Sequence, residues 1–591
     1  MPAALTRNFP AALLLLAACS HAPPPVAAQK KSWIERSNEN AQLLLDVQAR
    51  FLPEQAARTG VAGIDDRVMD LAKDHRARQR QATADALARL EERQNAEQDP
   101  LVKQDLAILV DAARRQIQGS LLHEQLTAPY YPLPRMIFGS MRGLLDPQVA
   151  KERRPAALMR VRRYAGLEPG TTAAVQLAEA ETREGLQKGL LAPSRLEVEN
   201  DLETSRFLID GIGKLFEQYP IDGAAPPVAE LRKQLEGYLD FVKTELLPKS
   251  RDDFRLPPEL YAFQLRQVGV DIPAPALAQL AHAAFTQIQG EMQTVAARVA
   301  KERGLPSADY RAVIKELKKT QIPDDQVLVF YQHRLGQIEQ IIRDQKLVTL
   351  PTRPARIRLG TPAENAAQPA PHMIPPRLLG NTGEQGEFVL PLAVPGKAEH
   401  PGEQKYDDFN FDAAAWTLTA HEARPGHELQ FARMVESGVS VARAIFAFNS
   451  VNAEGWGLYA EAITLPFMPD DGQLISLQLR LQRAARAFVD PELQEGKWTP
   501  QAAREFLMKE VGLSPAFATE EVDRFTFRAP AQATSYFYGY TRLVELRAAA
   551  EKQLGGGFRA QAFHDLVLAQ GLLPPDLLRK AVLANLRVEP R

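Results

Sequence analysis

The chain has 591 residues, which is too long for one small core and predicts two or three lobes or one large helical body. Its 45% hydrophobic and 24% charged residues are typical of a globular protein. A formal net charge of −2 implies no broad basic face, so we expect no nucleic-acid partner. After residue 20, no stretch has the roughly 18 unbroken apolar residues of a membrane span.

The N-terminus has the pattern of an export signal. Residues 11–18 are apolar but too short to cross a membrane, and Leu-Ala-Ala-Cys ending at Cys19 resembles the lipobox of bacterial lipoproteins. We therefore predict a lipoprotein signal peptide over 1–18, lipidation of Cys19 and a tether over 19–30. Ser20 favours a lipid anchor in the outer membrane, facing the periplasm of the cell envelope. The alternative is an ordinary secretory signal in which Cys19 is incidental.

Cys19 is the single cysteine of the chain, so the sequence offers no intrachain disulfide and no thiolate metal site. From residue 31 to residue 250 the apolar residues recur three and four positions apart, which predicts an N-terminal helical lobe. The clearest predicted helices there are Arg67–Asn95, Leu101–Leu122 and Pro227–Leu247.

We expect residues 251–591 to form a second, catalytic helical lobe. Pro275–Arg303 is a long amphipathic segment that begins at a proline and ends before a glycine. Another helix is predicted from Pro323 to about Gln345, and the chain becomes helical again from Phe411 onward.

Short strands are expected between the two helical parts of this lobe, at about 351–395. Proline and glycine become frequent there, and Arg356–Leu359 and Glu387–Leu390 have the composition of strands. Pro391 interrupts the second, which suits an edge strand. An edge strand beside a catalytic helix could bind an extended peptide by β-addition. A surface loop with some order is an equally good interpretation of this region.

Residues 421–427, His-Glu-Ala-Arg-Pro-Gly-His, place two imidazoles six positions apart. On an undistorted helix, position i+6 lies about 120° round from position i, so the two rings would not converge. Pro425 lacks an N–H and its ring would collide with a carbonyl one turn earlier, and Gly426 tolerates unusual dihedral angles. We therefore predict a bulge or break at Pro425-Gly426 that turns His427 back toward His421.

A catalytic zinc site needs three protein ligands and one open position. Glu454, on the next predicted helix (about Asn452 to Leu465), is the natural third ligand beside the two histidines. Glu461 lies on the same helix face and is suited to orient an imidazole, although a solvated surface charge is an equal alternative. The competing interpretation of the whole cluster is a pair of structural histidines near a salt-bridged glutamate.

These motifs resemble those of the bacterial family called domain of unknown function 885. They comprise His-Glu-x-x-Pro-Gly-His, then Glu-Gly-Trp-x-Leu-Tyr-x-Glu, then a block over 530–539 that ends in Ser-Tyr-x-x-Gly, and a C-terminal Phe-His-Asp at 563–565. The resemblance spans about residues 35–585, and that family is grouped with the gluzincin metallopeptidases. Two residues depart from its pattern: Glu428 replaces a frequent histidine, and Ala531 replaces the usual glycine.

The resemblance implies a role for each matching residue. His421, His427 and Glu454 would bind one Zn²⁺ ion, and Glu422 would act as general base and then general acid. Tyr536 would donate to the oxyanion, or is an ordinary packed aromatic. Arg524 or Arg528 could pair with the C-terminal carboxylate of a substrate, although an exposed surface arginine is the commoner outcome. Tyr538 is a candidate for substrate binding, and Tyr538 and Tyr540 are nearby substitutes for Tyr536. His564 is more often structural.

Together these features predict a mainly α, large two-lobed gluzincin-like metallopeptidase with a small β-sheet beside the active-site cleft. The expected function is zinc-dependent hydrolysis of peptide bonds in short peptides, with a peptide substrate and membrane contact only through the N-terminal lipid. Two ligand histidines and one carboxylate suit zinc. No Gly-x-Ser-x-Gly motif supports a serine hydrolase. The non-enzymatic alternative is an outer-membrane binding or assembly lipoprotein with a degenerate metal site.

Overall fold

The computed structural model describes residues 31–392, 394–395, 403–404 and 406–587. The predicted signal peptide, the lipidation site Cys19 and the tether lie outside these described residues. Within them, no helix combines the length and the apolar composition needed to cross a membrane.

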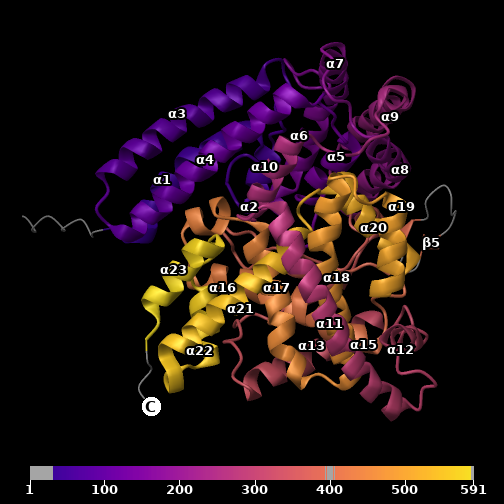
Figure 1. Cartoon of the computed structure of the whole chain (residues 1–591). Coiled ribbons are helices and arrows are strands. Elements are labelled where there is room, and N and C mark those ends of the chain that lie inside the picture. The colour runs from indigo at the N-terminus through magenta and orange to yellow at the C-terminus, as the bar shows by residue number, and fades with distance from the viewer. Residues whose placement is uncertain (1–30, 393, 396–402, 405, 588–591) are drawn as a thin grey trace, which may run out of the picture.

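The chain is mainly helical, and its N-terminal helices form one layer at the top of Figure 1. Their starts follow local capping chemistry: Ser32 and Glu35 form a reciprocal capping box at α1, and Asp99 accepts backbone N–H groups at the start of α4. The elements of this layer are α1 (Trp33–Phe51), α2 (Pro53–Thr59), α3 (His75–Ala96), α4 (Pro100–Leu126), α5 (Leu133–Arg142), η1 (Lys151–Arg153), α6 (Pro155–Tyr164), α7 (Ala174–Gln187), α8 (Arg195–Gln218), α9 (Ala225–Phe241), η2 (Val242–Leu246) and η3 (Leu247–Lys249).

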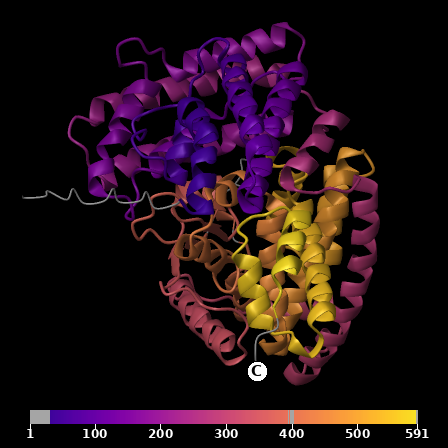
Figure 2. The same ribbon diagram turned by 90° about the vertical axis from the view of Figure 1, so that its left-hand side faces the viewer.

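Most of the remaining helices form the larger lower body in Figures 1 and 2, whereas α10 lies beside α4 in the upper layer. The remaining helices follow in chain order. They are α10 (Pro258–Val268), α11 (Ala274–Arg303), α12 (Tyr310–Leu317), α13 (Val327–Asp344), α14 (Pro362–Ala367), α15 (Asp412–Leu418), η4 (Thr419–Ala423), α16 (His427–Ser437), η5 (Ala442–Phe446), α17 (Ser450–Thr464), η6 (Leu465–Phe467), α18 (Asp470–Gln494), α19 (Pro500–Phe506), η7 (Leu507–Val511), α20 (Pro515–Asp523), η8 (Arg524–Arg528), α21 (Thr534–Leu554), η9 (Gly555–Gly557), α22 (Ala560–Leu568) and α23 (Pro575–Asn585).

The two layers share buried contacts. Apolar side chains of α1, α3 and α4 pack in the same core as side chains of α16, α17, α21 and α22. A buried ion pair crosses this junction, because Arg443 of η5 donates through Nε to Asp105 of α4 at 2.8 Å. Ser440 donates to the same carboxylate at 2.5 Å. The first helices of the chain therefore brace the helices that carry the candidate site.

The start of the predicted helix Arg67–Asn95 is wrong, since α3 begins only at His75. Side chains bind the backbone before that point: Glu54 accepts from the N–H of Met69 at 2.7 Å, and Asp70 accepts from the N–H of Ala72 at 2.9 Å. Such side chain–backbone bonds compete with helical ones and hold the segment in turns.

A small sheet lies against the lower body, with strand order β1-β3-β2. The strands are β1 (Arg356–Leu359), β2 (His372–Ile374) and β3 (Glu387–Leu390); β4 (Val394–Pro395) and β5 (Glu403–Gln404) form a separate pair. In the register, β1 is parallel to β3, with Ile357 opposite Phe388, and β2 is antiparallel to β3, with Met373 opposite Phe388.

The expectation that 387–390 is an edge strand is wrong, because β3 is the fully buried centre of the sheet. Pro391 does not conflict with this position. The last paired residue is Leu390, whose carbonyl accepts from the N–H of Gly360 at 2.9 Å, so the missing N–H of Pro391 removes no ladder bond. The edge strand of the described three-stranded sheet that reaches the candidate site is β2, which the sequence analysis did not predict.

Candidate metal centre

The predicted break between the two histidines is confirmed. The helix α15 widens into the π-helix η4, which holds His421 and ends at Ala423, and α16 begins at His427. Between them Arg424 is extended, and the Arg424–Pro425 peptide bond is cis. Gly426 packs against the preceding turn so closely that a Cβ would lie 1.8 Å from the carbonyl oxygen of His421. Only glycine allows this approach, which brings His427 back beside His421.

The Glu-Gly-Trp motif on α17 fixes the same loop. The indole Nε1 of Trp456 donates to the carbonyl oxygen of Pro425 at 3.0 Å. Gly457 leaves room for the imidazoles, since a Cβ there would lie 2.7 Å from Cε1 of His421. The absence of a side chain at Gly457 therefore leaves space on α17 for the two imidazole rings.

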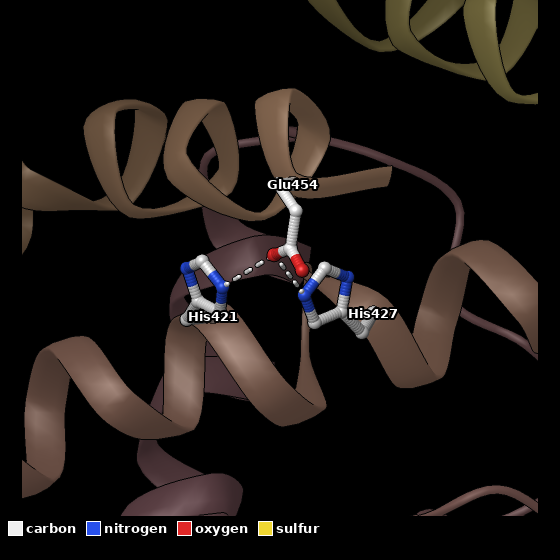
Figure 3. A group of neighbouring side chains, drawn as sticks. All are labelled: His421, His427 and Glu454. Carbon is white, nitrogen blue, oxygen red and sulfur yellow. Dashed lines mark hydrogen bonds and ion pairs between the residues drawn. The ribbon is translucent and has the colours of Figure 1, made fainter. Parts of the chain in front are cut away.

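Two imidazole nitrogens and one carboxylate converge at the centre of Figure 3. Nε2 of His427 lies 3.2 Å from Oε2 of Glu454, and Nε2 of His421 lies 3.6 Å from the same oxygen. One ligand atom from each of the three residues lies within 4.8 Å of the others, so a single cation fits between them. Neutral imidazole and carboxylate donors suit Zn²⁺.

A second carboxylate, that of Glu461, binds the ring nitrogen of His421 that faces away from Glu454. Nδ1 of His421 donates to Oε1 of Glu461 at 2.6 Å, and Thr417 donates to Oε2 of Glu461 at 2.6 Å. Glu461 is fully buried, so the alternative of a solvated surface charge is wrong. The hydrogen on Nδ1 leaves the lone pair of Nε2 directed at the shared centre, as metal ligation requires.

Two carboxylates, those of Glu454 and Glu461, flank the imidazole of His421 at this centre. Burial lowers the pKa of His421, but hydrogen bonds to Glu454 and Glu461 outweigh this effect and raise the pKa to about 9. Burial raises the pKa of Glu454, and hydrogen bonds from His421 and His427 outweigh that effect and hold it well below its usual value. An arrangement that favours protonated imidazole beside carboxylate equally favours a cation in the place of that proton.

Glu422 and Tyr536 line one small cavity of about 180 Å³ beside these three ligands. Glu422 is half-buried there, and burial raises its pKa. The ring of Tyr536 stacks on that of His421 with centroids 6.2 Å apart. Nη1 of Arg524, which also lines the cavity, donates to the hydroxyl of Tyr536 at 3.4 Å. Six predicted residues therefore line the cavity: His421, Glu422, His427, Glu454, Arg524 and Tyr536.

Tyr538, predicted to bind substrate, does not line this cavity. Its hydroxyl donates to Asp271, on the border of a separate groove. The reason is helical period: two positions after Tyr536, the side chain of Tyr538 points about 200° round α21. The side chain of Tyr540 likewise lies elsewhere, where Arg480 stacks on it with its guanidinium carbon 5.2 Å from the ring centre.

Two other candidates have structural roles. Arg528 lies 3.7 Å from Asp523 in an ion pair and does not line the cavity. His564 is fully buried; its Nδ1 donates to the carbonyl oxygen of Leu347 at 2.6 Å, and its Nε2 accepts from the hydroxyl of Tyr459 at 2.9 Å. The structural interpretation of His564 is confirmed.

The sequence analysis missed several residues at the site. The amide of Gln532 donates to Ser450 at 3.0 Å and to Oε1 of Glu454 at 3.5 Å, so it orients a ligand. The signal that could have indicated Gln532 was its place in the motif block over 530–539. Arg483 and Arg486 line the cavity from α18, where only their spacing of three beside apolar residues could have indicated a shared buried face.

The two departures from the family pattern have local explanations. Glu428 is buried and accepts from Nε of Arg424 at 2.7 Å, so it stabilises the loop between the histidines and does not face the ligands. Ala531 has φ +74°, in the left-handed region that favours glycine, and its N–H donates to Asp490 at 3.0 Å.

The Glu-Gly-Trp motif on α17 and the motif block over 530–539, which continues into α21, are in contact through a pair of glycines, Gly455 and Gly539. A Cβ on Gly455 of α17 would lie 2.5 Å from the carbonyl carbon of Gly539 of α21. The two helices therefore touch backbone to backbone, and this contact sets Glu454 and Tyr536 on facing surfaces.

Comparison with known proteins supports the fold and the family. A crystal structure named "putative lipoprotein from Colwellia psychrerythraea" has a TM-score of 0.74 at 17% identity, covering 93% of this chain and 99% of that one. A structure named "putative lipoprotein of unknown function from Shewanella oneidensis" has a TM-score of 0.66 at 18% identity, covering 94% of this chain and all of that one. No curated protein matches the sequence. The model of the family described as "Bacterial protein of unknown function (DUF885)" matches residues 53–582, so the chain belongs to that family.

Proposed function

We propose that the protein is a gluzincin-like zinc metallopeptidase that hydrolyses peptide bonds in short peptides. The observation that carries this proposal is the convergence of His421, His427 and Glu454 within 4.8 Å, beside a cavity that Glu422 also lines. A purely structural histidine pair would need neither the directed Nε2 lone pair nor an open cavity next to it.

His421, His427 and Glu454 would hold the ion. When bound, zinc supplies a lowered pKa for water and polarisation of a carbonyl. The residues around the cavity supply the rest of the chemistry. Glu422 is suited to take the proton that water loses on attack and to pass it to the leaving nitrogen. The hydroxyl of Tyr536, held by Arg524, is suited to donate to the oxygen that gains negative charge.

An extended peptide fits the surroundings of the cavity. The strand β2 contributes His372 and Met373 to the lining, and its second edge pairs with no strand among those described. Such an edge offers main-chain hydrogen bonds to a peptide laid beside it. The cavity of about 180 Å³ admits a few side-chain-sized groups, which favours short peptides over folded proteins.

A place in the cell envelope follows from two independent features. Cys19 ends a lipobox-like sequence, and both similar solved proteins carry names that include lipoprotein. We place the protein on the outer membrane, facing the periplasm and held by its N-terminal lipid.

Replacing Glu422 tests the proposal. The variant Glu422→Gln should keep one zinc ion per chain and lose peptide hydrolysis, since the amide cannot accept the proton. Wild-type hydrolysis should stop with a chelator and return with added zinc. Undiminished activity in Glu422→Gln would remove this residue from the mechanism. Wild-type protein that purifies without stoichiometric zinc and hydrolyses no peptide would support the non-catalytic binding lipoprotein instead.

A further inference from the structure

Three arginine side chains line the cavity on the side of Tyr536. They are Arg483 and Arg486 of α18 and Arg524 at the start of η8. Arg483 is 6% exposed and Arg486 is 3% exposed, and the guanidinium carbon of Arg486 lies 4.4 Å from the ring centre of Tyr536. Buried guanidinium groups are costly unless anions or hydrogen-bond acceptors surround them, so the partners of each one matter.

Two of the three charges have partners within the protein. Arg486 makes a bidentate pair with Glu521, with N–O distances of 2.5 and 2.6 Å. Arg483 donates to the carbonyl oxygen of Leu479 at 3.2 Å, and it lies 4.0 Å from Glu461. Glu461 already accepts from Nδ1 of His421, so the charge of Arg483 is only partly balanced.

Arg524 is different. Its side chain donates only to the neutral hydroxyl of Tyr536, and no carboxylate of the described residues forms an ion pair with it. Nearby Glu521 is committed to Arg486. The cavity therefore contains one guanidinium that forms no ion pair with a described carboxylate, although the charges of the buried Glu520 and Glu521 act on it. It lies beside a centre that would gain positive charge when a metal binds.

We infer that Arg524, with Arg483 and Arg486 behind it, binds the free C-terminal carboxylate of the peptide substrate, so that the protein acts as a carboxypeptidase. This inference rests on the proposed peptidase function. A guanidinium matches a carboxylate in shape and charge, because two parallel N–H groups meet two oxygens. The cavity is small, about 180 Å³, which favours a short chain of roughly one or two residues beyond the cleaved bond.

The reaction balances with water alone. Water adds its oxygen to the carbonyl carbon near the C-terminus, the C–N bond breaks, and the leaving nitrogen gains a proton. The products are a shortened peptide with a new carboxylate and the released C-terminal amino acid or dipeptide. Arg524 binds the carboxylate of the C-terminal fragment that is released. The substrate therefore supplies the anion that pairs with its guanidinium.

A matched pair of peptides tests the inference: one N-acetylated tetrapeptide with a free C-terminal carboxylate, and the same peptide as its C-terminal amide. Turnover of both is measured with the zinc-loaded wild type and with the Arg524→Gln and Arg524→Lys variants. Binding of both is measured by calorimetry on the zinc-loaded Glu422→Gln protein, with and without Arg524→Gln. Arg480→Gln is the control, since Arg480 lies on α18 but does not line the cavity.

We expect the free acid to be the better substrate and the tighter ligand by roughly 10- to 100-fold, as for a charge-assisted hydrogen-bonded pair. Arg524→Gln should erase that preference chiefly through KM, Arg524→Lys should restore part of it, and Arg480→Gln should leave it unchanged. Chelator-sensitive hydrolysis that treats acid and amide alike, before and after Arg524→Gln, would overturn the inference while the peptidase proposal stands. If neither peptide is hydrolysed but the acid binds preferentially through Arg524, carboxylate recognition holds and the peptidase proposal falls.

Discussion

The carboxylate of Glu461 accepts a hydrogen bond from Nδ1 of His421 at 2.6 Å, on the far side of the ring from Glu454. This pairing sets the tautomer of His421 and directs its Nε2 at the cation position. Because Thr417 holds the other oxygen of Glu461, the ring has little freedom to turn.

Glu461→Gln should weaken zinc binding by roughly 10- to 100-fold, as is usual when the residue orienting a metal-bound histidine is lost. The amide carries no negative charge and holds the imidazole less firmly. Competition with a chromogenic chelator measures the change. Glu428→Gln is the control, because Glu428 is equally buried but contacts Arg424 and no ligand. Equal affinities of Glu461→Gln and wild type would show that Glu461 does not orient the ligand.

Gly457→Ala should disturb the ligands directly. Its Cβ would lie 2.8 Å from Nε2 of His421, closer than real Cβ contacts, and 3.0 Å from Cε1 of His427, tighter than most. We expect zinc affinity to fall by more than roughly tenfold, because both rings must move. Gly237→Ala on α9 is the control, since a Cβ there meets nothing within 4 Å. Zinc affinity that is unchanged by Gly457→Ala would mean that the rings are not held where the structure has them.

Gly539→Ala should destabilise the fold. A Cβ on Gly539 would lie 2.0 Å from the carbonyl oxygen of Val451 and 2.7 Å from Cα of Gly455, so α17 and α21 would have to separate. Overpacking of this kind costs about 1–3 kcal/mol or more. The thermal midpoint should fall, whereas Gly290→Ala, in open space on α11, should leave it unchanged or raise it. A midpoint for Gly539→Ala equal to that of Gly290→Ala would exclude the close helix contact.

Asp490 gives the protein a defined pH dependence. Burial raises its pKa from 3.8 to about 7, although the N–H of Ala531 and the hydroxyl of Tyr261 bind it. Between about pH 4 and pH 7 the folded carboxyl keeps a proton that the unfolded carboxyl has lost. Stability should therefore fall as the pH rises through this range, by at most about 1.4 kcal/mol per pH unit from this group.

Asp490→Asn removes this titration. Thermal midpoints at pH 5 and pH 7 should differ less in the variant than in the wild type, whose midpoint should be lower at pH 7. An equal difference in the two proteins would show that the Asp490 carboxyl does not change its proton binding on folding.

Most helices and the three convergent residues were predictable, because their signals are local. Prolines and periodic apolar residues mark α4, α9 and α11, and the Pro425-Gly426 pair already implied the break that brings His427 beside His421. The apolar period also marks α13, but its predicted start at Pro323 is wrong, because the helix begins at Val327 without a side-chain cap. Glu454 was predictable as the third ligand because it lies on the next predicted helix after the two histidines.

What the sequence did not reveal depends on contacts between distant segments. Pro391 after strand β3 suggested an edge position, but pairing with both β1 and β2 buries the strand. Arg483 and Arg486 look like the polar face of α18 until Tyr536 and Glu521 pack against them.

The most direct test of the account is X-ray anomalous scattering at the zinc edge from crystals of the purified protein. The account predicts one ion per chain, about 2.0–2.2 Å from Nε2 of His421, Nε2 of His427 and a carboxylate oxygen of Glu454. An ion bound elsewhere, or no ion at this position in the presence of zinc, would contradict it.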